Sequence, residues 1–402
     1  MIQRPIYINQ LDSYRDTRLI KIVSGVRRCG KSTLLEMYRQ HLLKNKIHPK
    51  QIIEINLEDA DYRHLLDPYV LHDYIKAKLD PKKMNYVFLD EIQNVKNFEK
   101  AVNSLFIKKN VDLYITGSNA FILSGELATF LSGRYVEIHL LPLSFKEYFS
   151  ALSTGKPPSR HYQDYIINGS FPYSLELAEK KDSKNQIRKY LDGIYNTILL
   201  KDIVARKKVA DTLMLESLVR FLFDNIGSET STKKIADSMT SAGRKISVHT
   251  VENYISALTD SYIIYRLGRY DIKGKQHLKT GHKYYIVDSG LRYYLLGSQA
   301  GDEGRVLENI VFLELLRRGY EINYGKIEIF EVDFIASKGS EKLYFQVSFT
   351  CRDKSTMERE LRPLDMIRDH NPKYLITMDD DPPAMFNGIR RINAIDWLLK
   401  AH

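Results

Sequence analysis

Short segments rich in consecutive apolar residues recur along the first 140 positions of the chain. They occupy residues 19–24, 86–89, 111–116 and 135–140. Apolar segments of this length are typical of strands that are buried on both faces of a parallel sheet. The first segment is followed by a helical pattern, which places Leu34, Leu35 and Tyr38 on one face. The pattern predicts an α/β fold for this part of the chain.

A different pattern, with apolar residues at helical spacing, marks residues 231–258. The predicted elements are a helix at 231–239 capped by Ser231 or Thr232, a turn at 241–246, a helix at 247–258 capped by Ser247, and strands at 262–267 and 284–287. The buried stripe of the second helix is predicted to be Val248, Val251, Ile255 and Leu258. Two helices followed by a hairpin predict a winged helix-turn-helix.

The last hundred residues carry a fainter alternation of elements. Glu308 is predicted to open an amphipathic helix that runs to residue 316, and strands are predicted at 331–335 and 343–348. A helix followed by two neighbouring strands predicts a small α/β module at the end of the chain.

The turn between the first apolar segment and its helix carries the most specific motif of the chain. Residues 25–32 read Gly-Val-Arg-Arg-Cys-Gly-Lys-Ser, which is G-x-x-x-x-G-K-S. This is a phosphate-binding loop, in which glycines let main-chain N–H groups approach a polyphosphate closely. The residues predicted to bind the nucleotide are Gly25, Arg28, Cys29, Gly30, Lys31, Ser32, Thr33 and Asp90. Lys31 is expected to contact the β- and γ-phosphates, and the Ser32 hydroxyl is expected to bind Mg²⁺.

An acidic pair follows the second apolar segment. Asp90 and Glu91 come at its carboxyl end, where ligands bind in open α/β sheets. We expect Asp90 to complete the Mg²⁺ site and Glu91 to polarise the attacking water. Ser118 and Asn119 follow the third segment and are predicted to contact the γ-phosphate or the water, although such residues are also common in turns.

The first 175 residues or so resemble the AAA+-type P-loop ATPases of bacteria and archaea. The matching stretches are residues 25–33, 88–93, 116–120, 123–126, 131–135, 141–145 and 169–172. The resemblance implies a five-stranded core and a phosphate-sensing residue at Ser118 or Asn119. It also implies that Arg134 is an arginine finger acting on the nucleotide of a neighbouring subunit, and hence a homo-oligomer, either a ring or an open spiral.

The carboxyl-terminal pattern is similar to the PD-(D/E)XK nuclease fold, in which acidic groups bind a divalent cation and a lysine assists the attacking water. Glu308 and Asp333 match the first two acidic positions of that motif. Gln346 stands in place of an acid, and Ser348 in place of the lysine. The resemblance therefore implies a nuclease-like domain that is degenerate, and nuclease activity is not expected.

Together these features predict an α/β protein with a P-loop three-layer α/β/α core, a helical lid, a winged helix and a small restriction-endonuclease-like α/β domain. The predicted boundaries are 1–150 for the ATPase core, 151–225 for the lid and linker, 226–295 for the winged helix-turn-helix and 296–402 for the nuclease-like domain.

Charge adds a possible partner to this picture. The chain has a formal net charge of +10, and residues 181–280 hold 18 Lys and Arg against 11 Asp and Glu. Such a local excess favours an anionic polymer, so DNA is the predicted partner. His249, Thr250 and Asn253 on the second helix, with Lys273 and Lys275 on the hairpin turn, are the predicted DNA contacts. Winged helices also dock proteins, so that alternative stays open.

Cysteine content and hydropathy limit the alternatives. Cys29 and Cys351 are the two cysteines, too few for a disulfide framework or a zinc site. No apolar segment approaches the eighteen or so residues that span a bilayer, and the first residues lack a secretory signal. We therefore expect a cytoplasmic protein without membrane contact.

Three functions remain compatible with the sequence. The first is an ATPase, dependent on ATP and Mg²⁺, that couples hydrolysis to binding, loading or remodelling DNA. The second is a nucleotide-controlled signalling or defence switch that acts on a protein partner. The third is an ATP-gated DNA nuclease. Glu91 favours hydrolysis, while Gln346 and Ser348 argue against the nuclease.

Overall fold

The computed structural model describes residues 2–117, 133–152, 155–180, 183–204, 209, 211–274, 276–299 and 301–400. Contacts divide the chain into two compact units, which are described separately below. The first is Met1–Pro142 with Asp260–Tyr262, and the second is Leu143–Thr259 with Ile263–His402. Whereas the sequence predicts four segments, the contacts group the last three, together with residues 143–150, into one unit.

The first unit alternates helices and strands. Its helices are α1 (Pro5–Ser13), α2 (Lys31–Lys44), α3 (Pro68–Lys78) and α4 (Phe98–Ile107), with short 3₁₀ helices at Pro49–Gln51, Ala60–Leu65 and Ile92–Asn94. Its strands are β1 (Ile20–Ser24), β2 (Ile52–Asn56), β3 (Asn85–Asp90), β4 (Val111–Thr116) and β5 (Tyr135–His139).

The five strands form one parallel sheet in the order β2-β3-β4-β1-β5. β1 lies between β4 and β5, so it is hydrogen-bonded to another strand on each side. The apolar segments predicted as strands are strands β1, β3, β4 and β5, which confirms the predicted parallel sheet. Parallel pairing places the loops after β1, β3 and β4 at the same edge of the sheet.

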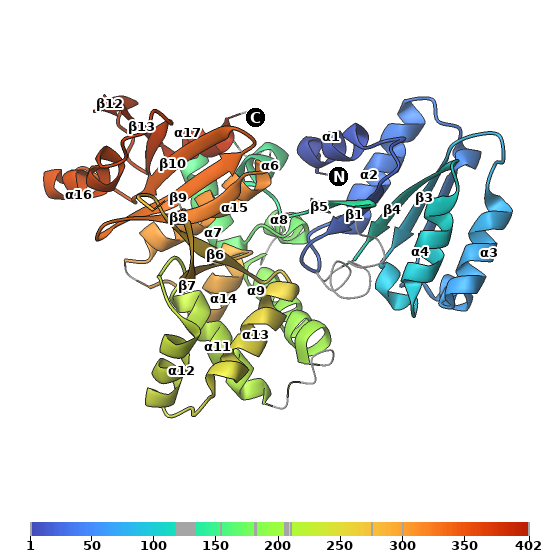
Figure 1. Ribbon diagram of the computed structural model, residues 1–402, viewed down its shortest axis with the longest axis horizontal. Coiled ribbons are helices and arrows are strands. Elements are labelled where there is room, and N and C mark those ends of the chain that lie inside the picture. The colour runs from blue at the N-terminus through green and yellow to red at the C-terminus, as the bar shows by residue number, and fades with distance from the viewer. Residues whose placement is uncertain are drawn as a thin grey trace. The chain divides into compact units, whose positions relative to one another are not determined.

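Helices cover both faces of this sheet, with α1 and α2 on one face and α3 and α4 on the other (Figure 1). Alternating strand residues explain the two layers. Ile20 and Ile22 join the core that packs against α3 and α4, while Lys21 between them points to the other face. There its buried ammonium forms an ion pair with Asp112 of β4.

The second unit begins with helices. They are α6 (Phe145–Ala151), α7 (Pro158–Asn168), α8 (Pro172–Ala178), α9 (Ser183–Thr197), a π-helix (Ile198–Val204), α11 (Thr212–Asp224), α12 (Thr232–Ser241), α13 (Val248–Asp260), α14 (Ser289–Leu296), α15 (Glu303–Arg317), α16 (Lys354–Asp365) and α17 (Ala394–Leu399). Its strands are β6 (Ile264–Asp271), β7 (Gln276–Ile286), β8 (Glu321–Ile327), β9 (Phe330–Lys338), β10 (Glu341–Val347), β11 (Lys373–Thr377), β12 (Ala384–Phe386) and β13 (Ile389–Asn393).

All eight strands of the second unit form one mixed sheet, in the order β12-β13-β11-β10-β9-β8-β6-β7. The predicted hairpin is present as β6 and β7, but it is not a free wing. β6 pairs in parallel with β8, so the hairpin extends the sheet of the carboxyl-terminal module. A domain boundary between residues 295 and 296 would therefore separate β6 and β7 from the other strands of the same sheet.

The helices of the second unit agree with the sequence in type but not in every boundary. The helix predicted to open at Glu308 begins at Glu303, so Glu308 lies inside α15 rather than at its start. Helices α7, α9 and α11 of the segment predicted as a lid pack against α14 within this unit. Across the described part of the chain, no helix combines the length and the apolar character that crossing a membrane requires.

Candidate functional site

The loop between β1 and α2 has a backbone that depends on glycine. Gly25 has a φ of 143°, and a Cβ at this position would lie 2.2 Å from the carbonyl oxygen of Leu140. Gly30, with a φ of 103°, precedes the first residue of α2. Arg28 also has a left-handed φ of 69°, and its side chain is exposed. Main-chain N–H groups of such a loop, at the amino end of a helix, form a cradle for an anion.

The two side chains at the centre of the loop are buried. Lys31 is the first residue of α2, and its Nζ donates to the carbonyl oxygens of Gly25 at 3.1 Å and Val26 at 3.2 Å. Among the described residues, no carboxylate forms an ion pair with this ammonium, so its charge remains available to a phosphate. Cys29 is fully buried, and this burial raises the pKa of its thiol.

Asp90 ends β3 and lies beside the loop. The hydroxyl of Thr116, the last residue of β4, donates to Asp90 Oδ1, and the Ser32 hydroxyl lies beside this carboxylate. Burial raises the pKa of Asp90 above its ordinary value, although both hydroxyl contacts oppose the shift. A buried carboxylate with a hydroxyl beside it is the oxygen-ligand pair that Mg²⁺ takes in P-loop enzymes, so these residues fit the metal.

Glu91 is held next to Asp90 in a strained conformation. Its φ is 52°, which is uncommon for a residue with a side chain. Its N–H donates to Thr116 Oγ1 at 2.9 Å, and the amide of Gln93 donates to its carboxylate. Thr116 therefore connects both members of the acidic pair, a role that nothing in the local sequence indicates. Strain that the surroundings maintain in this way is typical of functional positions.

A second polar cluster, which was not predicted from the sequence, lies where β1 leads into the loop. Ser24, the last residue of β1, donates to Glu137 and lies 3.1 Å from Nδ1 of His139. The Tyr262 hydroxyl donates to Glu137 at 3.2 Å. Burial and the charge of Lys31 lower the pKa of His139 to about 4, so its imidazole is neutral at pH 7. Parallel pairing of β1 with β5 brings these residues together, and only that long-range register could have revealed them.

Arg134 lies at the other edge of the sheet. Its guanidinium donates to Asn103 Oδ1 at 2.9 Å and is exposed. Its carbonyl accepts from the N–H of Ile20, at the beginning of β1, whereas the phosphate loop follows the end of β1. At about 3.3 Å per residue, that strand separates them by roughly 16 Å. Arg134 is therefore not part of the nucleotide site of its own chain. Ser118 and Asn119 lie outside the described residues.

The predicted DNA contacts lie on α13 and near the hairpin turn. Ser231 and Ser247 cap α12 and α13, as predicted, through hydrogen bonds with the N–H groups of Lys234 and Thr250. His249 and Asn253 are exposed on α13 and lie 3.3 Å apart, and Thr250 is partly buried beside them. Val248 is 38% exposed, so the prediction that it belongs to the buried stripe is wrong; Tyr254 and Ala257 are buried on that helix instead.

On the hairpin turn, the predicted DNA contact Lys273 is already paired with a carboxylate. Lys273 forms an ion pair with Glu328 at 2.8 Å, in the turn that joins β8 to β9. A phosphate would have to compete with this carboxylate for the ammonium. Lys275 lies outside the described residues.

Part of the nuclease-like motif comes together in the second unit, around an unpredicted lysine. Lys283 of β7 is almost completely buried, and its Nζ lies 3.0 Å from Glu308 Oε1, 2.7 Å from Glu331 Oε1 and 3.6 Å from Asp333 Oδ1. Gln346 is also nearby, since its Oε1 accepts from the N–H of Asp333 at 3.4 Å. The sequence prediction included Glu308, Asp333 and Gln346 but missed Lys283 and Glu331.

Ser348 does not join this cluster. It follows the last residue of β10, its hydroxyl donates to the carbonyl oxygen of Thr350 at 3.1 Å, and its N–H donates to Ile376. Ser348 therefore belongs to the loop at the end of the strand, and no contact links it to the acidic residues.

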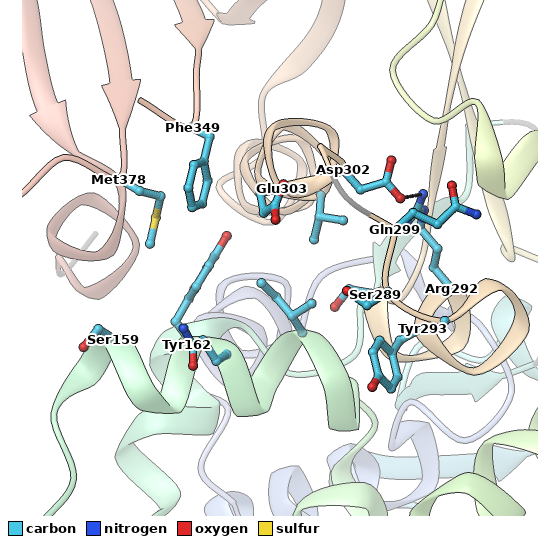
Figure 2. A pocket seen from close by; sticks show the side chains of 15 residues that line it. Ser159, Tyr162, Ser289, Arg292, Tyr293, Gln299, Asp302, Glu303, Phe349 and Met378 are labelled. Carbon is cyan, nitrogen blue, oxygen red and sulfur yellow. Dashed lines mark hydrogen bonds and ion pairs between the residues drawn. The ribbon is translucent and has the colours of Figure 1, made fainter. Parts of the chain in front are cut away.

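The second unit also contains a cavity of about 210 Å³ that matches no predicted site. Figure 2 shows Tyr162 of α7 pointing into it, with Phe349 and Met378 on one side and Glu303 of α15 on another. The Tyr162 hydroxyl has no hydrogen-bond partner among the described residues, and Arg292 in the wall is paired with Asp302. Its walls contain no arrangement of acid, base and nucleophile within the described residues, so we assign no chemistry to it.

The first unit has the architecture of one class of protein. A parallel sheet of this order, a glycine loop between β1 and α2, and an acidic pair at the end of β3 define a P-loop ATPase of the AAA type. Comparison with known families agrees, because residues 17–149 match an AAA domain. Residues 159–302 match a domain of unknown function, DUF8612.

Relatives of the whole chain are found in bacteria and archaea. An uncharacterized protein of Haemophilus influenzae is 41% identical over 404 residues, which cover 100% of this chain and 99% of the relative. The uncharacterized protein MJ1544 of Methanocaldococcus jannaschii is 32% identical over 90% of this chain and 82% of its own length. The chain belongs to the family of these two proteins.

A solved structure agrees with the fold. The Walker-type ATPase PABY2304 of Pyrococcus abyssi aligns with 73% of this chain and 96% of its own, with a TM-score of 0.50. Sequence identity is 15%, so this similarity concerns the fold alone.

Proposed function

We propose that the first unit binds ATP with Mg²⁺ and hydrolyses it, and that the protein couples this cycle to binding, loading or remodelling DNA. The position of Asp90 carries the ATPase part of the proposal. Its carboxylate lies beside the hydroxyl of Ser32, the residue that follows Lys31 in the phosphate loop. An oxygen-ligand pair for Mg²⁺ thus lies beside an ammonium and the N–H groups that bind phosphate.

Each residue of the site has a role in this proposal. The loop from Gly25 to Thr33 holds the phosphates through its N–H groups, and Lys31 adds positive charge. Ser32 and Asp90 hold Mg²⁺, which neutralises phosphate charge when it is bound. Glu91 accepts a hydrogen bond from water and polarises it for attack, and Gln93 keeps its carboxylate in place. Ser118 or Asn119 contacts the γ-phosphate.

Removing the acidic metal ligand tests the proposal. Asp90→Asn keeps the shape of the side chain but removes its charge, and should lower Mg²⁺-dependent phosphate release by about 10²-fold or more. Asp73→Asn is the matched control, because Asp73 is 78% exposed and lies on α3. Unchanged turnover in Asp90→Asn would contradict the assignment.

The place of Arg134 at the opposite edge of the sheet supports a role in a neighbouring subunit. An arginine finger supplied in this way contributes about 10³- to 10⁵-fold to the rate of phosphoryl transfer. Arg134→Ala should therefore bind ATP but hydrolyse it slowly. Mixing it with Lys31→Ala protein should restore part of the activity, because each variant supplies what the other lacks. Full turnover by Arg134→Ala alone would contradict both the arginine finger and the oligomer that it implies.

The exposed face of α13 supports the DNA part of the proposal. His249 and Asn253 are exposed there, and Lys233, Lys234, Arg244 and Lys245 are exposed on α12 and the following turn. Short polar side chains flanked by cations suit a nucleic-acid backbone and base edges. We expect DNA to stimulate ATP hydrolysis, with a stimulation that falls steeply as salt rises.

Variants of this face separate DNA from a protein partner. The double variant His249→Ala/Asn253→Ala should weaken DNA binding, whereas Lys354→Ala, which removes an exposed cation on α16, should not. Single-stranded, duplex and branched DNA should be compared across a salt series. If none of them changes the ATPase rate, the nucleotide-controlled switch acting on a protein partner becomes the favoured function.

An ATP-gated nuclease remains the least favoured function. Gln346 supplies no negative charge, and Ser348 lies away from the acidic residues. A Mg²⁺-dependent cleavage of DNA that is lost in Asp333→Asn would restore this alternative.

A further inference from the structure

The point where a metal would be expected in the second unit is taken by an amino group. The Nζ of Lys283 lies within 3.0 Å of Glu308 Oε1 and 2.7 Å of Glu331 Oε1, with Asp333 Oδ1 at 3.6 Å. Divalent cations bind carboxylate oxygens at about 2.0–2.6 Å. An ion held by these same oxygens would therefore have to stand where the ammonium stands.

The other oxygens of Asp333 and Glu331 are engaged as well, and Glu308 Oε1 has a second donor. Glu308 Oε1 accepts from the Tyr285 hydroxyl at 2.6 Å, and Gly227 packs so closely against this side chain that a Cβ on Gly227 would lie 2.9 Å from Glu308 Oε2. Asp333 Oδ2 accepts from the N–H of Val347 at 2.9 Å. Glu331 Oε2 faces the ammonium of Lys326 at 3.5 Å. Little coordination capacity is left for a metal.

The residue that replaces an acid of the motif also argues against metal binding. Gln346 donates from Nε2 to Glu360 at 2.9 Å, so its amide is already oriented by a neighbouring carboxylate. Within the described residues, no group of three or more metal-binding side chains is suitably placed to hold an ion.

Lys283 keeps its charge in this environment. Burial alone would lower the pKa of its ammonium, but the carboxylates of Glu308, Asp333 and Glu331 raise it well above the ordinary value. A buried cation surrounded by carboxylates compensates charges that would otherwise be costly to bury.

We propose that the ammonium of Lys283 is a built-in cation that replaces a divalent metal in the cluster of Glu308, Glu331 and Asp333. The second unit then keeps the acidic residues of its α/β module without metal binding or cleavage chemistry. Lys283 comes from β7, Glu308 from α15, and Glu331 and Asp333 from β9. The cluster therefore links the hairpin of β6 and β7 to α15 and to β9 of the same sheet. This proposal does not depend on ATP hydrolysis by the first unit.

Titration with Mn²⁺ tests the proposal in the full chain. The parent protein carries Asp90→Asn and Glu91→Gln, which removes the acidic pair of the first unit. Binding of Mn²⁺ to this parent is followed by the electron paramagnetic resonance signal of the free ion, and it should reveal no site that depends on Asp333. Adding Lys283→Ala should open one site and increase Mn²⁺ affinity by at least about tenfold. Adding Asp333→Asn to that protein should remove the gain.

One control and one fallback comparison complete the test. Lys326→Ala also removes a cation that faces Glu331, but its ammonium does not contact Glu308 or Asp333, so it should open no site. If Lys283→Ala fails to fold, the parent and its Asp333→Asn derivative still provide a test, because both should bind Mn²⁺ equally weakly.

Three results would overturn the proposal. The first is Mn²⁺ binding by the parent that Asp333→Asn abolishes. The second is a folded Lys283→Ala protein that gains no site. The third is Mg²⁺-dependent DNA cleavage by the wild type that Lys283→Ala abolishes, which would make Lys283 a catalytic residue.

Discussion

Both units bring carboxylates and one buried lysine together, but the lysine has different partners in the two places. In the first unit, Lys31 donates to the carbonyl oxygens of Gly25 and Val26, while Asp90 accepts from the hydroxyl of Thr116. In the second, Lys283 pairs directly with three carboxylates. Acidic residues alone therefore do not define a metal site, because the partner of the lysine decides whether the carboxylates remain available.

The positions of the two clusters in their sheets explain the contrast. Asp90 is the last residue of β3, at the edge of the sheet that carries the loops and the amino end of α2 and where ligands bind in open α/β sheets. Lys283 and Asp333 lie within strands β7 and β9 and face α15, which supplies Glu308. An edge leaves room for a nucleotide, whereas a position between a sheet and a helix favours internal pairing.

The largest expected effect in this comparison comes from Glu91. Glu91→Gln should lower the rate of ATP hydrolysis by about 10²- to 10⁴-fold, because the amide cannot accept a proton from water. ATP should remain bound, since the loop is unchanged. Phosphate release and binding of a fluorescent ATP analogue measure the two steps. Glu99→Gln, which makes the same replacement in α4, is the control, and equal losses in both variants would remove the special role of Glu91.

The second prediction concerns the stability of the second unit. Lys283→Met should lower its free energy of unfolding by about 3–5 kcal/mol, because the buried Asp333 and the largely buried Glu308 lose their counter-ion. The single tryptophan, Trp397, is buried in α17 of this unit, so its fluorescence during urea unfolding reports on the unit directly. Lys31→Met should leave this transition unchanged. A shift caused by Lys31→Met, or none caused by Lys283→Met, would break the distinction between the two lysines.

A smaller effect is expected at Thr116. Thr116→Val keeps the side-chain shape but removes the hydroxyl that contacts Asp90 and the N–H of Glu91. Loss of these hydrogen bonds should cost about 1–3 kcal/mol of transition-state stabilisation, or roughly 5- to 150-fold in turnover. Thr17→Val, at an exposed position that precedes β1, is a suitable comparison. Equal losses of turnover in Thr17→Val and Thr116→Val would show that the Thr116 connection is unimportant.

The smallest effect concerns pH. Burial and the charge of Glu308 raise the pKa of Asp333 well above its ordinary value, and Lys283 opposes this shift. Because a raised folded-state pKa stabilises the protonated form, stability falls as pH rises through that pKa. Lys283→Met should therefore regain stability on acidification from pH 8 towards pH 5.5, by about 1.4 kcal/mol for each unit of additional shift. The wild type should show a weaker dependence, and a Lys283→Met protein that is least stable at pH 5.5 would contradict this reasoning.

Much of the geometry of the candidate nucleotide site could be predicted because its signals are local. The loop from Gly25 to Ser32, the preceding strand and the following helix are contiguous, and Asp90 directly follows its apolar segment. Burial on both faces of a parallel sheet leaves a characteristic continuous pattern, which explains why β4 begins and ends as predicted.

Contacts between distant residues could not be predicted in this way. Ser24, Glu137, His139 and Tyr262 meet through strand pairing and chain crossing, for which a single sequence has no periodic signal. The same holds for the pairing of β6 with β8 and for Lys283, which lies 25 positions before Glu308 in the sequence. The beginning of α15 was misplaced because nearly the whole helix is buried, so its apolar residues do not mark one face.

The most direct measurement of the central claim is titration of the full-length protein with ATP and Mg²⁺, followed by phosphate release, for the wild type and Lys31→Ala. Lys44→Ala, at the exposed end of the same helix, is the control. We predict that the wild type and Lys44→Ala bind and hydrolyse ATP, and that Lys31→Ala does neither at comparable concentrations. A wild type that neither binds nor hydrolyses ATP, or a Lys31→Ala protein that does both normally, would contradict the account.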